Sequence, residues 1–243
     1  MIDDSILADL VLEDVSLRLV EPHLYTVYPE ASATQTYDKM AVFYDLVMGN
    51  RFYNRIMWGY RTADYGPFCE KALKSSSDGW VLDAGCGSLV FTAGTYANYS
   101  ERPVVLLDRS IEMLRAAKSR LVRLTGGVPS NMVFLHGDAL DLPFRPGTFR
   151  TVLCMNLIHV LEDANSAALG LKRVTADGGT LSITTLVANN RFGDRYLNML
   201  SRRGLIVPRT ADQVSEIFDA LNMPAKYHVN GNMMYLEAAS DSA

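Results

Sequence analysis

Short apolar runs alternate with helical stretches from Trp80 onward, and this alternation constrains the fold more than any other feature of the chain. The runs predict strands over 81–83, 104–108, 132–136, 151–155 and 180–186, and the stretches predict helices over 112–124, 165–174 and 211–221. A run that is apolar on both faces, as 104–107 is, is typical of a buried parallel strand. The pattern therefore predicts an α/β fold with βαβ units around a mostly parallel sheet. Two last runs, 226–229 and 233–237, flank an Asn-Gly-Asn turn and favour a final antiparallel hairpin.

The first third of the chain lacks this alternation of short apolar runs and helical stretches, and we expect 1–79 to be an N-terminal helical extension and cap. Apolar residues at helical spacing among acids predict an acidic amphipathic helix over 2–20. Such a helix covers a hydrophobic flank of its own chain or joins two copies into a homodimer. The stretches 36–58 and 62–73 are predicted to be cap helices. We expect 80–243 to be one domain, with an insert at about 187–210.

Composition excludes several classes of protein. The chain has 243 residues, 49% of them hydrophobic, which is typical of a globular protein with a sizeable core. Its formal net charge of −4 disfavours a nucleic-acid partner. Cys69, Cys86 and Cys154 lack metal-ligand spacing and predict reduced thiols, no bound metal and a cytoplasmic location. No apolar run reaches the roughly 20 residues of a membrane span.

A Gly-x-Gly turn follows the first predicted strand of the sheet. The strand ends in Asp83, and Gly85, Cys86 and Gly87 come next, ahead of a predicted helix. Ligands of open α/β sheets bind at the carboxyl ends of the strands, where glycine lets them approach the backbone closely. The turn therefore indicates a nucleotide-like ligand, although a tight structural turn has the same appearance.

Acids at the ends of the next two predicted strands favour the ligand interpretation. Asp108 lies 25 residues beyond Asp83, where a carboxylate accepts both hydroxyl protons of a ribose. Its alternative role is to cap the following helix, but Ser110 is itself a good cap. Asp138 follows the third strand, where its carboxylate and the N–H of Ala139 suit the edge of an adenine ring.

The charge of the site distinguishes among nucleotides. A pyrophosphate cofactor calls for a third glycine, and that position holds Leu89. Asp83 would repel a phosphate but attracts a ligand that carries an ammonium group and a sulfonium centre. These features favour S-adenosylmethionine over NAD or FAD.

The sequence resembles the class I S-adenosylmethionine-dependent methyltransferases, and among them the small-molecule branch of quinone and lipid enzymes. The similar motifs are Val-Leu-Asp-Ala-Gly-Cys-Gly at 81–87, Leu-Asp-Arg-Ser-Ile-Glu-Met-Leu at 107–114 and Gly-Asp-Ala-Leu-Asp-Leu-Pro-Phe at 137–144, followed by 149–163 and 173–184. The resemblance implies a Rossmann-like, doubly wound, seven-stranded sheet with an antiparallel last strand. The stretch around Tyr37 and Tyr44 is similar to that branch's N-terminal helix, whose tyrosines close over the cofactor.

By position, the resemblance implies a set of cofactor-binding residues. Asp83, Gly85, Cys86 and Gly87 would lie at the methionine end, and Asp108 would bind the ribose. Arg109 would lie beside the adenine, whose edge Asp138 and Ala139 would hold. Asn156, at the end of the fourth strand, would face the methionine amino group.

Methyl transfer requires alignment, exclusion of water and, for some acceptors, a base. His159 follows the fourth strand and is the candidate base, with local backbone hydrogen bonding as its alternative role. In the insert, Phe192 and Tyr196 lie at helical spacing near Arg202, Arg203 and Arg209. The insert is predicted to be either a lid over an apolar acceptor with an acidic group or an ordinary surface helix.

The sequence thus predicts methyl transfer from S-adenosylmethionine to a small apolar or aromatic acceptor of quinone, lipid or secondary-metabolite type, with S-adenosylhomocysteine as product. One alternative is a protein that binds S-adenosylmethionine without turnover, as a sensor or assembly partner. A methyltransferase acting on nucleic acid or protein is disfavoured by the acidic balance and by the lack of an Asn-Pro-Pro-Tyr tetrapeptide at 156–159. A nicotinamide dehydrogenase is the remaining alternative.

Overall fold

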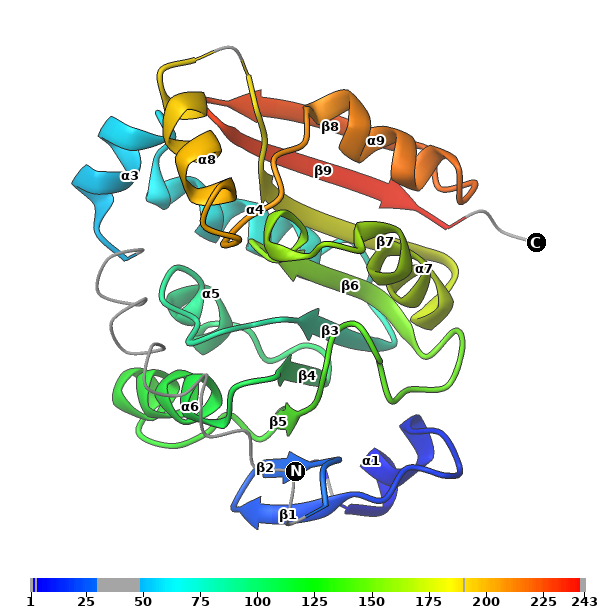
Figure 1. The fold of residues 1–243 in the computed structure, drawn as a ribbon. Helices are drawn as coiled ribbons and strands as arrows, with labels where there is room; N and C mark the ends of the chain where they lie inside the picture. The colour runs from blue at the N-terminus through cyan, green and yellow to red at the C-terminus, as the bar shows by residue number, and fades with distance from the viewer. Residues whose placement is uncertain (1, 3, 30–48, 190, 241–243) are drawn as a thin grey trace.

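The computed structural model describes residues 2, 4–29, 49–189 and 191–240, and they form a nine-stranded sheet with helices on both faces (Figure 1). The strand order is β1-β2-β5-β4-β3-β6-β7-β9-β8. The strands are β1 (Arg18–Glu21), β2 (Leu24–Thr26), β3 (Trp80–Ala84), β4 (Val104–Asp108), β5 (Met132–His136), β6 (Phe149–Met155), β7 (Thr175–Leu186), β8 (Ala225–Asn230) and β9 (Met233–Ala239). The strands from β2 to β7 in this order pair in parallel, and antiparallel pairs lie at both edges.

The helices bury the two faces of the sheet in two apolar clusters. They are α1 (Asp4–Leu10), α3 (Arg51–Met57), α4 (Tyr65–Leu73), α5 (Ala93–Ala97), α6 (Ile111–Thr125), α7 (Ala164–Val174), α8 (Gly193–Ser201) and α9 (Ala211–Asp219), with short 3₁₀ helices η2 (Thr62–Asp64) and η3 (Ile158–Val160). One cluster holds residues of α1, α7 and α9, and the other holds residues of α4, α5 and α6. Successive strand residues alternate between them, since Leu82 belongs to the first and Val81 to the second. Within the described ranges, no helix has both the length and the apolar content that crossing a bilayer requires.

A third apolar cluster joins the cap to the far edge of the sheet. It contains Trp58, Tyr60 and Tyr65 near α3 and α4, together with Leu197 of α8 and Met233 of β9. Figure 1 shows α3 and α8 side by side, and the hydroxyl of Tyr53 donates to that of Tyr196 at 2.9 Å. The region beside the carboxyl end of β7 is therefore built mainly from aromatic side chains.

The strands and helices predicted from Trp80 onward are confirmed, including the final hairpin of β8 and β9. The seven expected strands are present as β3 to β9, but the sheet has nine strands. The two additional strands are β1 and β2, and they come from the N-terminal region, whose helix was predicted over 2–20 but ends at Leu10. The cap helix predicted over 36–58 falls partly outside the described residues, and its described part contains α3.

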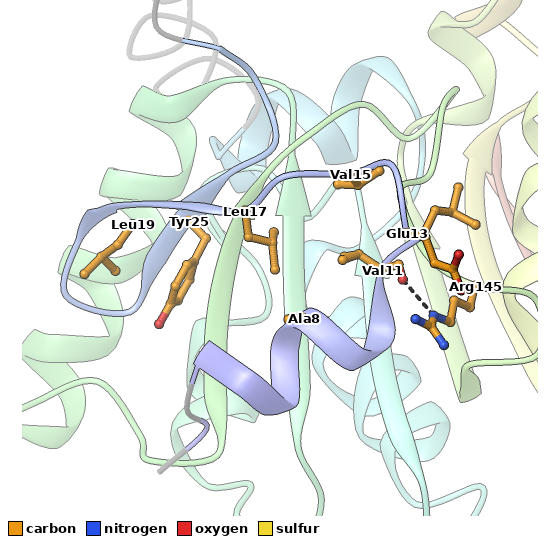
Figure 2. A pocket seen from close by; sticks show the side chains of 9 residues that line it. Ala8, Val11, Glu13, Val15, Leu17, Leu19, Tyr25 and Arg145 are labelled. Carbon is orange, nitrogen blue, oxygen red and sulfur yellow. Dashed lines mark hydrogen bonds between the residues drawn. The ribbon is translucent and has the colours of Figure 1, made fainter.

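The N-terminal helix ends early because a neighbouring loop takes over its hydrogen bonds. The N–H of Arg145 donates to the carbonyl of Leu10 at 2.9 Å, and Val11 pairs with Phe144 in an antiparallel bridge. The Nε of Arg145 donates to the carbonyl of Val11, also at 2.9 Å (Figure 2). No basic residue lies in the last turn of α1 to interact favourably with the negative end of the helix.

A cavity of about 500 Å³ lies between α1 and β1 (Figure 2). It is lined by Ala8, Val11, Leu12, Glu13, Val15, Leu17, Leu19, Tyr25 and Arg145. None of these lining residues is a predicted cofactor residue, so the cavity belongs to the N-terminal extension and not to the strand ends described next.

Candidate cofactor site

The predicted polar residues lie at the ends of four adjacent strands. Because β5, β4, β3 and β6 are parallel, their carboxyl ends meet at one edge of the sheet. Asp83 is the penultimate residue of β3, and Asp108 is the last residue of β4. Asp138 follows β5, and Asn156 follows β6. The structure therefore brings together residues that are 73 positions apart in the sequence, from Asp83 to Asn156.

Asp83 is buried, with only 2% of its surface exposed. The hydroxyl of Tyr96 in α5 donates to its Oδ2 at 2.7 Å, whereas no donor among the described residues reaches its Oδ1. Burial raises the pKa of Asp83 to about 7, and the nearby Asp108 carboxylate acts in the same direction. A buried carboxylate oxygen without a partner is costly, so this atom is a strong candidate to receive a cationic ligand.

The Gly-x-Gly turn leaves open space at Gly87. The N–H groups of Gly85 and Cys86 both donate to the carbonyl of Leu107, at 2.8 and 2.9 Å, which fastens the turn to β4. Gly87 has a φ of 55°, and a Cβ placed there would meet no heavy atom within 4 Å. Leu89 also has a positive φ, 57°, but its side chain is buried in the core under α5 and α6. Leu89 therefore does not block the turn.

Asp108 links the turn to the start of α6. Its Oδ2 accepts from the N–H of Gly87 at 2.8 Å, and its Oδ1 accepts from the N–H of Ser110 at 2.9 Å. Ser110 caps α6 by accepting from the N–H of Met113 at 3.3 Å, as predicted. Burial raises the pKa of Asp108, although its two backbone donors oppose the rise. Each carboxylate oxygen keeps a further lone pair, which suits the two hydroxyl groups of a ribose.

Asp138 and Arg109 face each other across the ends of β5 and β4. Asp138 Oδ1 accepts from the N–H of Leu140 at 2.9 Å, and its Oδ2 lies 3.7 Å from Nη1 of Arg109. The long ion pair leaves Oδ2 without a close hydrogen bond from the guanidinium. It is therefore positioned to accept from an exocyclic amino group such as that of adenine.

Asn156 has a left-handed backbone conformation, with a φ of 60°. Two hydroxyl groups hold its side chain. Its Oδ1 accepts from the hydroxyl of Tyr65 at 2.9 Å and from that of Thr184 at 3.4 Å. The carboxamide therefore presents its NH₂ group as a donor. The sequence prediction placed Asn156 against the methionine amino group, but this orientation suits the methionine carboxylate better.

His159 lies in η3, after β6, where it is buried and hydrogen-bonded to residues at the end of β7. Its Nδ1 accepts from the N–H of Leu186 at 3.3 Å and lies 3.3 Å from Oγ1 of Thr185. Burial lowers the pKa of His159 to about 4, and Arg209 acts in the same direction. A group with so low a pKa is a weak base near neutral pH, so the geometry favours the alternative of local backbone bonding.

The insert is anchored more firmly than a free lid. Arg209 donates to the carbonyls of Ile158, Leu161 and Glu162, at 3.2, 3.0 and 2.9 Å, and so is already engaged by the backbone. Tyr196 packs against Trp58, with ring centroids 5.2 Å apart. Phe192, by contrast, is 69% exposed. Tyr37 and Tyr44, the predicted closing tyrosines, lie outside the described residues.

Sequence reasoning missed two residues of the site, Tyr65 and Tyr96. Both are buried helix residues that bond to strand-end side chains, Asn156 and Asp83. Their only sequence signal is helical apolar spacing, which does not distinguish a core tyrosine from one that holds a site residue.

The residues at the strand ends fit a cationic adenine nucleoside. The unpartnered oxygen of Asp83 suits an ammonium group, and the space at Gly87 admits a ligand against the backbone. Among the residues that the structure describes, no group of three or more His, Cys, Asp or Glu side chains is arranged to hold a metal ion.

Comparison with known proteins agrees with this fit. Residues 81–179 match the family described as a methyltransferase domain. Residues 81–179 form a methyltransferase domain of the class I S-adenosylmethionine-dependent type. S-adenosylmethionine is its cofactor, and the sheet described above is the family's Rossmann-like fold with a hairpin added at one edge.

Individual relatives of this methyltransferase domain are distant. The chain is 30% identical to ajmaline N-methyltransferase from Rauvolfia serpentina, over 44% of this chain and 36% of that one. It is 26% identical to a ubiquinone/menaquinone biosynthesis C-methyltransferase from Idiomarina loihiensis, over 63% of each chain. The chain spans at most 37% of the length of the first three curated relatives that it matches.

Solved structures show the same fold at low identity. The structure titled as the [4+2]-cyclase SpnF is 15% identical with a TM-score of 0.65, covering 86% of this chain and 98% of its own. A geranyl diphosphate methyltransferase in complex with S-adenosylmethionine is 14% identical with a TM-score of 0.61, covering 80% and 92%.

Proposed function

We propose that the chain transfers a methyl group from S-adenosylmethionine to a small apolar or aromatic molecule. The observation that carries the proposal is the row of carboxylates, Asp83, Asp108 and Asp138, at three adjacent strand ends of a methyltransferase domain. When bound, S-adenosylmethionine supplies an electrophilic methyl group on a positively charged sulfur.

The residues of the chain bind and orient the cofactor in this proposal. Asp83 attracts the ammonium group with its unpartnered oxygen, and Asn156 donates to the carboxylate of the same amino acid. Asp108 accepts from the ribose hydroxyls, and Asp138 accepts from the adenine amino group. Holding both ends of the cofactor aligns its methyl group with an acceptor, and alignment is the larger part of catalysis for such a displacement.

The aromatic cluster beside Asn156 supports an apolar acceptor. Tyr65 stacks on Phe91, with ring centroids 4.6 Å apart, and contacts Tyr60 edge-to-face at 5.6 Å. Phe91 belongs to the segment between the glycine turn and α5, and Met155 immediately precedes Asn156. Apolar walls of this kind exclude water and bind flat, uncharged molecules.

Two measurements test the proposal in sequence. Titration calorimetry of the full chain with S-adenosylmethionine and S-adenosylhomocysteine is expected to show one site with micromolar affinity. Incubation with methyl-labelled S-adenosylmethionine and a panel of phenols, quinones, carboxylates and amines is then expected to label at least one organic-soluble product. Absence of binding to the folded chain would contradict the cofactor assignment.

A second function, binding of S-adenosylmethionine without methyl transfer, is favoured by the state of His159. The predicted base is buried and its Nδ1 is bonded to the backbone, so it is not free to deprotonate an acceptor. The solved structure titled as a [4+2]-cyclase shares the fold. Binding without labelling of any panel compound would favour this second function over methyl transfer.

A further inference from the structure

The added hairpin of β1 and β2 ends beside the predicted cofactor site, at the carboxyl ends of the parallel strands. β2 pairs in parallel with β5, so that Thr26 lies opposite His136, and the N–H of Val27 donates to the carbonyl of His136 at 3.1 Å. Because the two strands run in the same direction, the carboxyl end of β2 lies beside that of β5, which Asp138 follows. Residues directly after Thr26 therefore lie next to the predicted adenine end of the site.

His136 connects this hairpin to the cofactor residues. Its side chain is 7% exposed, and its Nδ1 lies 3.0 Å from Oγ1 of Thr26 on one side. On the other side its Nε2 lies 3.1 Å from the carbonyl of Arg109, the residue after Asp108. The imidazole is thus fixed between the hairpin and the end of β4.

Tyr28 packs on this fixed imidazole. Its ring contacts that of His136 edge-to-face, with centroids 4.7 Å apart and planes at 65°. Its backbone N–H donates to Oγ1 of Thr26 at 3.1 Å, which holds the residue close to the end of β2. Tyr28 is half-buried, so part of the residue remains accessible.

Charged residues of the predicted cofactor site lie around the Tyr28 hydroxyl. Burial raises the pKa of Tyr28, and the carboxylates of Asp138, Asp141 and Asp108 raise it further, while Arg109 lowers it. Asp108, Arg109 and Asp138 lie at the carboxyl ends of β4 and β5, and Asp108 and Asp138 are the predicted ribose and adenine ligands. An aromatic ring in this position is suited to packing on a nucleobase.

We propose that Tyr28, which follows β2 of the added hairpin, forms a wall of the adenine subsite and packs its ring against the base. This inference rests on the proposed function, because it requires that an adenine nucleoside occupies the strand ends. It assigns a binding role to the N-terminal extension, which the methyltransferase domain at 81–179 does not include.

Calorimetric titration of the full chain with S-adenosylhomocysteine and, separately, with free adenosine tests the inference. Tyr28→Ala is expected to lower the affinity for both ligands by a similar factor, about tenfold, because the lost contact is with the base. Tyr28→Phe keeps the ring and is expected to stay within about twofold of the wild type. Tyr227→Ala is the matched control, since Tyr227 is an exposed tyrosine of β8 at the opposite edge of the sheet.

The outcomes separate this inference from the proposed function. A folded Tyr28→Ala variant that binds both ligands as the wild type does would overturn the role of Tyr28 and leave the proposed function standing. Equal losses in Tyr28→Ala and Tyr28→Phe would also overturn it, since the ring would then not be the contact. Absence of binding to the wild-type chain would overturn both. Should Tyr28→Ala unfold, Tyr28→Leu, which keeps the apolar bulk but not the flat ring, is expected to show an intermediate loss.

Discussion

Asp83 is the residue on which the binding of a cation depends most directly. Its position could be predicted from the sequence, because an acid between an apolar strand and a Gly-x-Gly turn must lie at a strand end. Its environment could not be predicted, since Tyr96 reaches it from a helix that packs on the sheet only in the folded chain. The combination of full burial, one bonded oxygen and one unpartnered oxygen gives Asp83 a pKa close to neutral pH.

The affinity for S-adenosylmethionine should therefore depend on pH near neutrality. With a pKa of about 7, Asp83 is mostly protonated at pH 6 and mostly ionised at pH 8, and the ionised form attracts the ligand's ammonium group. We expect the dissociation constant to fall about tenfold between pH 6 and pH 8. Calorimetry at both pH values checks this, and the Asp83→Asn variant should bind weakly with little pH dependence. A wild-type affinity that is the same at pH 6 and pH 8 would contradict the role of Asp83.

The same residue should make the ligand-free chain less stable as the pH rises. The folded pKa of Asp83, about 7, lies above the value of 3.8 for an unperturbed carboxyl, so folding favours the protonated form. Its contribution to the free energy of unfolding is therefore present below about pH 4 and is lost as the pH rises through 7. Asp83→Asn keeps the shape without the charge and should be more stable than the wild type at pH 8 by roughly 1–3 kcal/mol.

Thermal unfolding at pH 5 and pH 8 measures this difference. The Asp83→Asn variant should gain more over the wild type at pH 8 than at pH 5. Asp177→Asn, at an exposed position, serves as the control and should change little at either pH. Equal gains of Asp83→Asn at both pH values would contradict the assignment.

Tyr65 should matter for the cofactor through Asn156 and not only through packing. Tyr65→Phe removes the hydroxyl that donates to Asn156 Oδ1, which frees the carboxamide to rotate. We expect a three- to tenfold loss of affinity for S-adenosylhomocysteine, with a stability loss of about 1 kcal/mol. Tyr99→Phe is the matched control, because that buried hydroxyl donates to the carbonyl of Leu73 at 3.2 Å in a different apolar cluster. It should cost similar stability and leave the affinity unchanged.

At the scale of elements, the parallel strands could be predicted and the N-terminal hairpin could not. β4 and β5 match their predicted bounds because continuous apolar runs have few other ways to be buried. β1 and β2 are short strands at one edge of the sheet, and the sequence as far as Val20 also fits the amphipathic helix predicted over 2–20. What decides between the two is hydrogen bonding to β5 and to Arg145, which are more than 100 residues away in the chain. Local spacing contains no information about such distant partners.

α1 should stabilise its own chain. Leu7 is fully buried in the sheet's core, whereas the adjacent Ile6 is 42% exposed. Leu7→Ala should lower the free energy of unfolding by about 2–4 kcal/mol, and Ile6→Ala should stay within about 0.5 kcal/mol of the wild type. Urea titration of both variants checks the difference. Similar effects of the two substitutions would show that α1 does not pack on the sheet in solution as it does in the structure, and sedimentation of Ile6→Ala tests whether the exposed face joins two copies.

At the scale of the whole molecule, the cofactor side could be predicted and the acceptor side could not. The strand-end acids follow one another at spacings that the parallel sheet imposes, so their meeting follows from the fold. The aromatic cluster of Trp58, Tyr65, Tyr196 and Tyr235 gathers residues from four separate segments, none of which has a recognisable motif. The acceptor therefore has to be found by experiment.

A crystal structure of the full chain with S-adenosylhomocysteine would show how the nucleoside binds at the strand ends. We expect both ribose hydroxyls within hydrogen-bonding distance of the Asp108 carboxylate, the amino group of the amino acid at Asp83, and the adenine between Asp138 and Tyr28. A nucleoside bound elsewhere, or bound with a different group at Asp83 and Asp108, would contradict this arrangement.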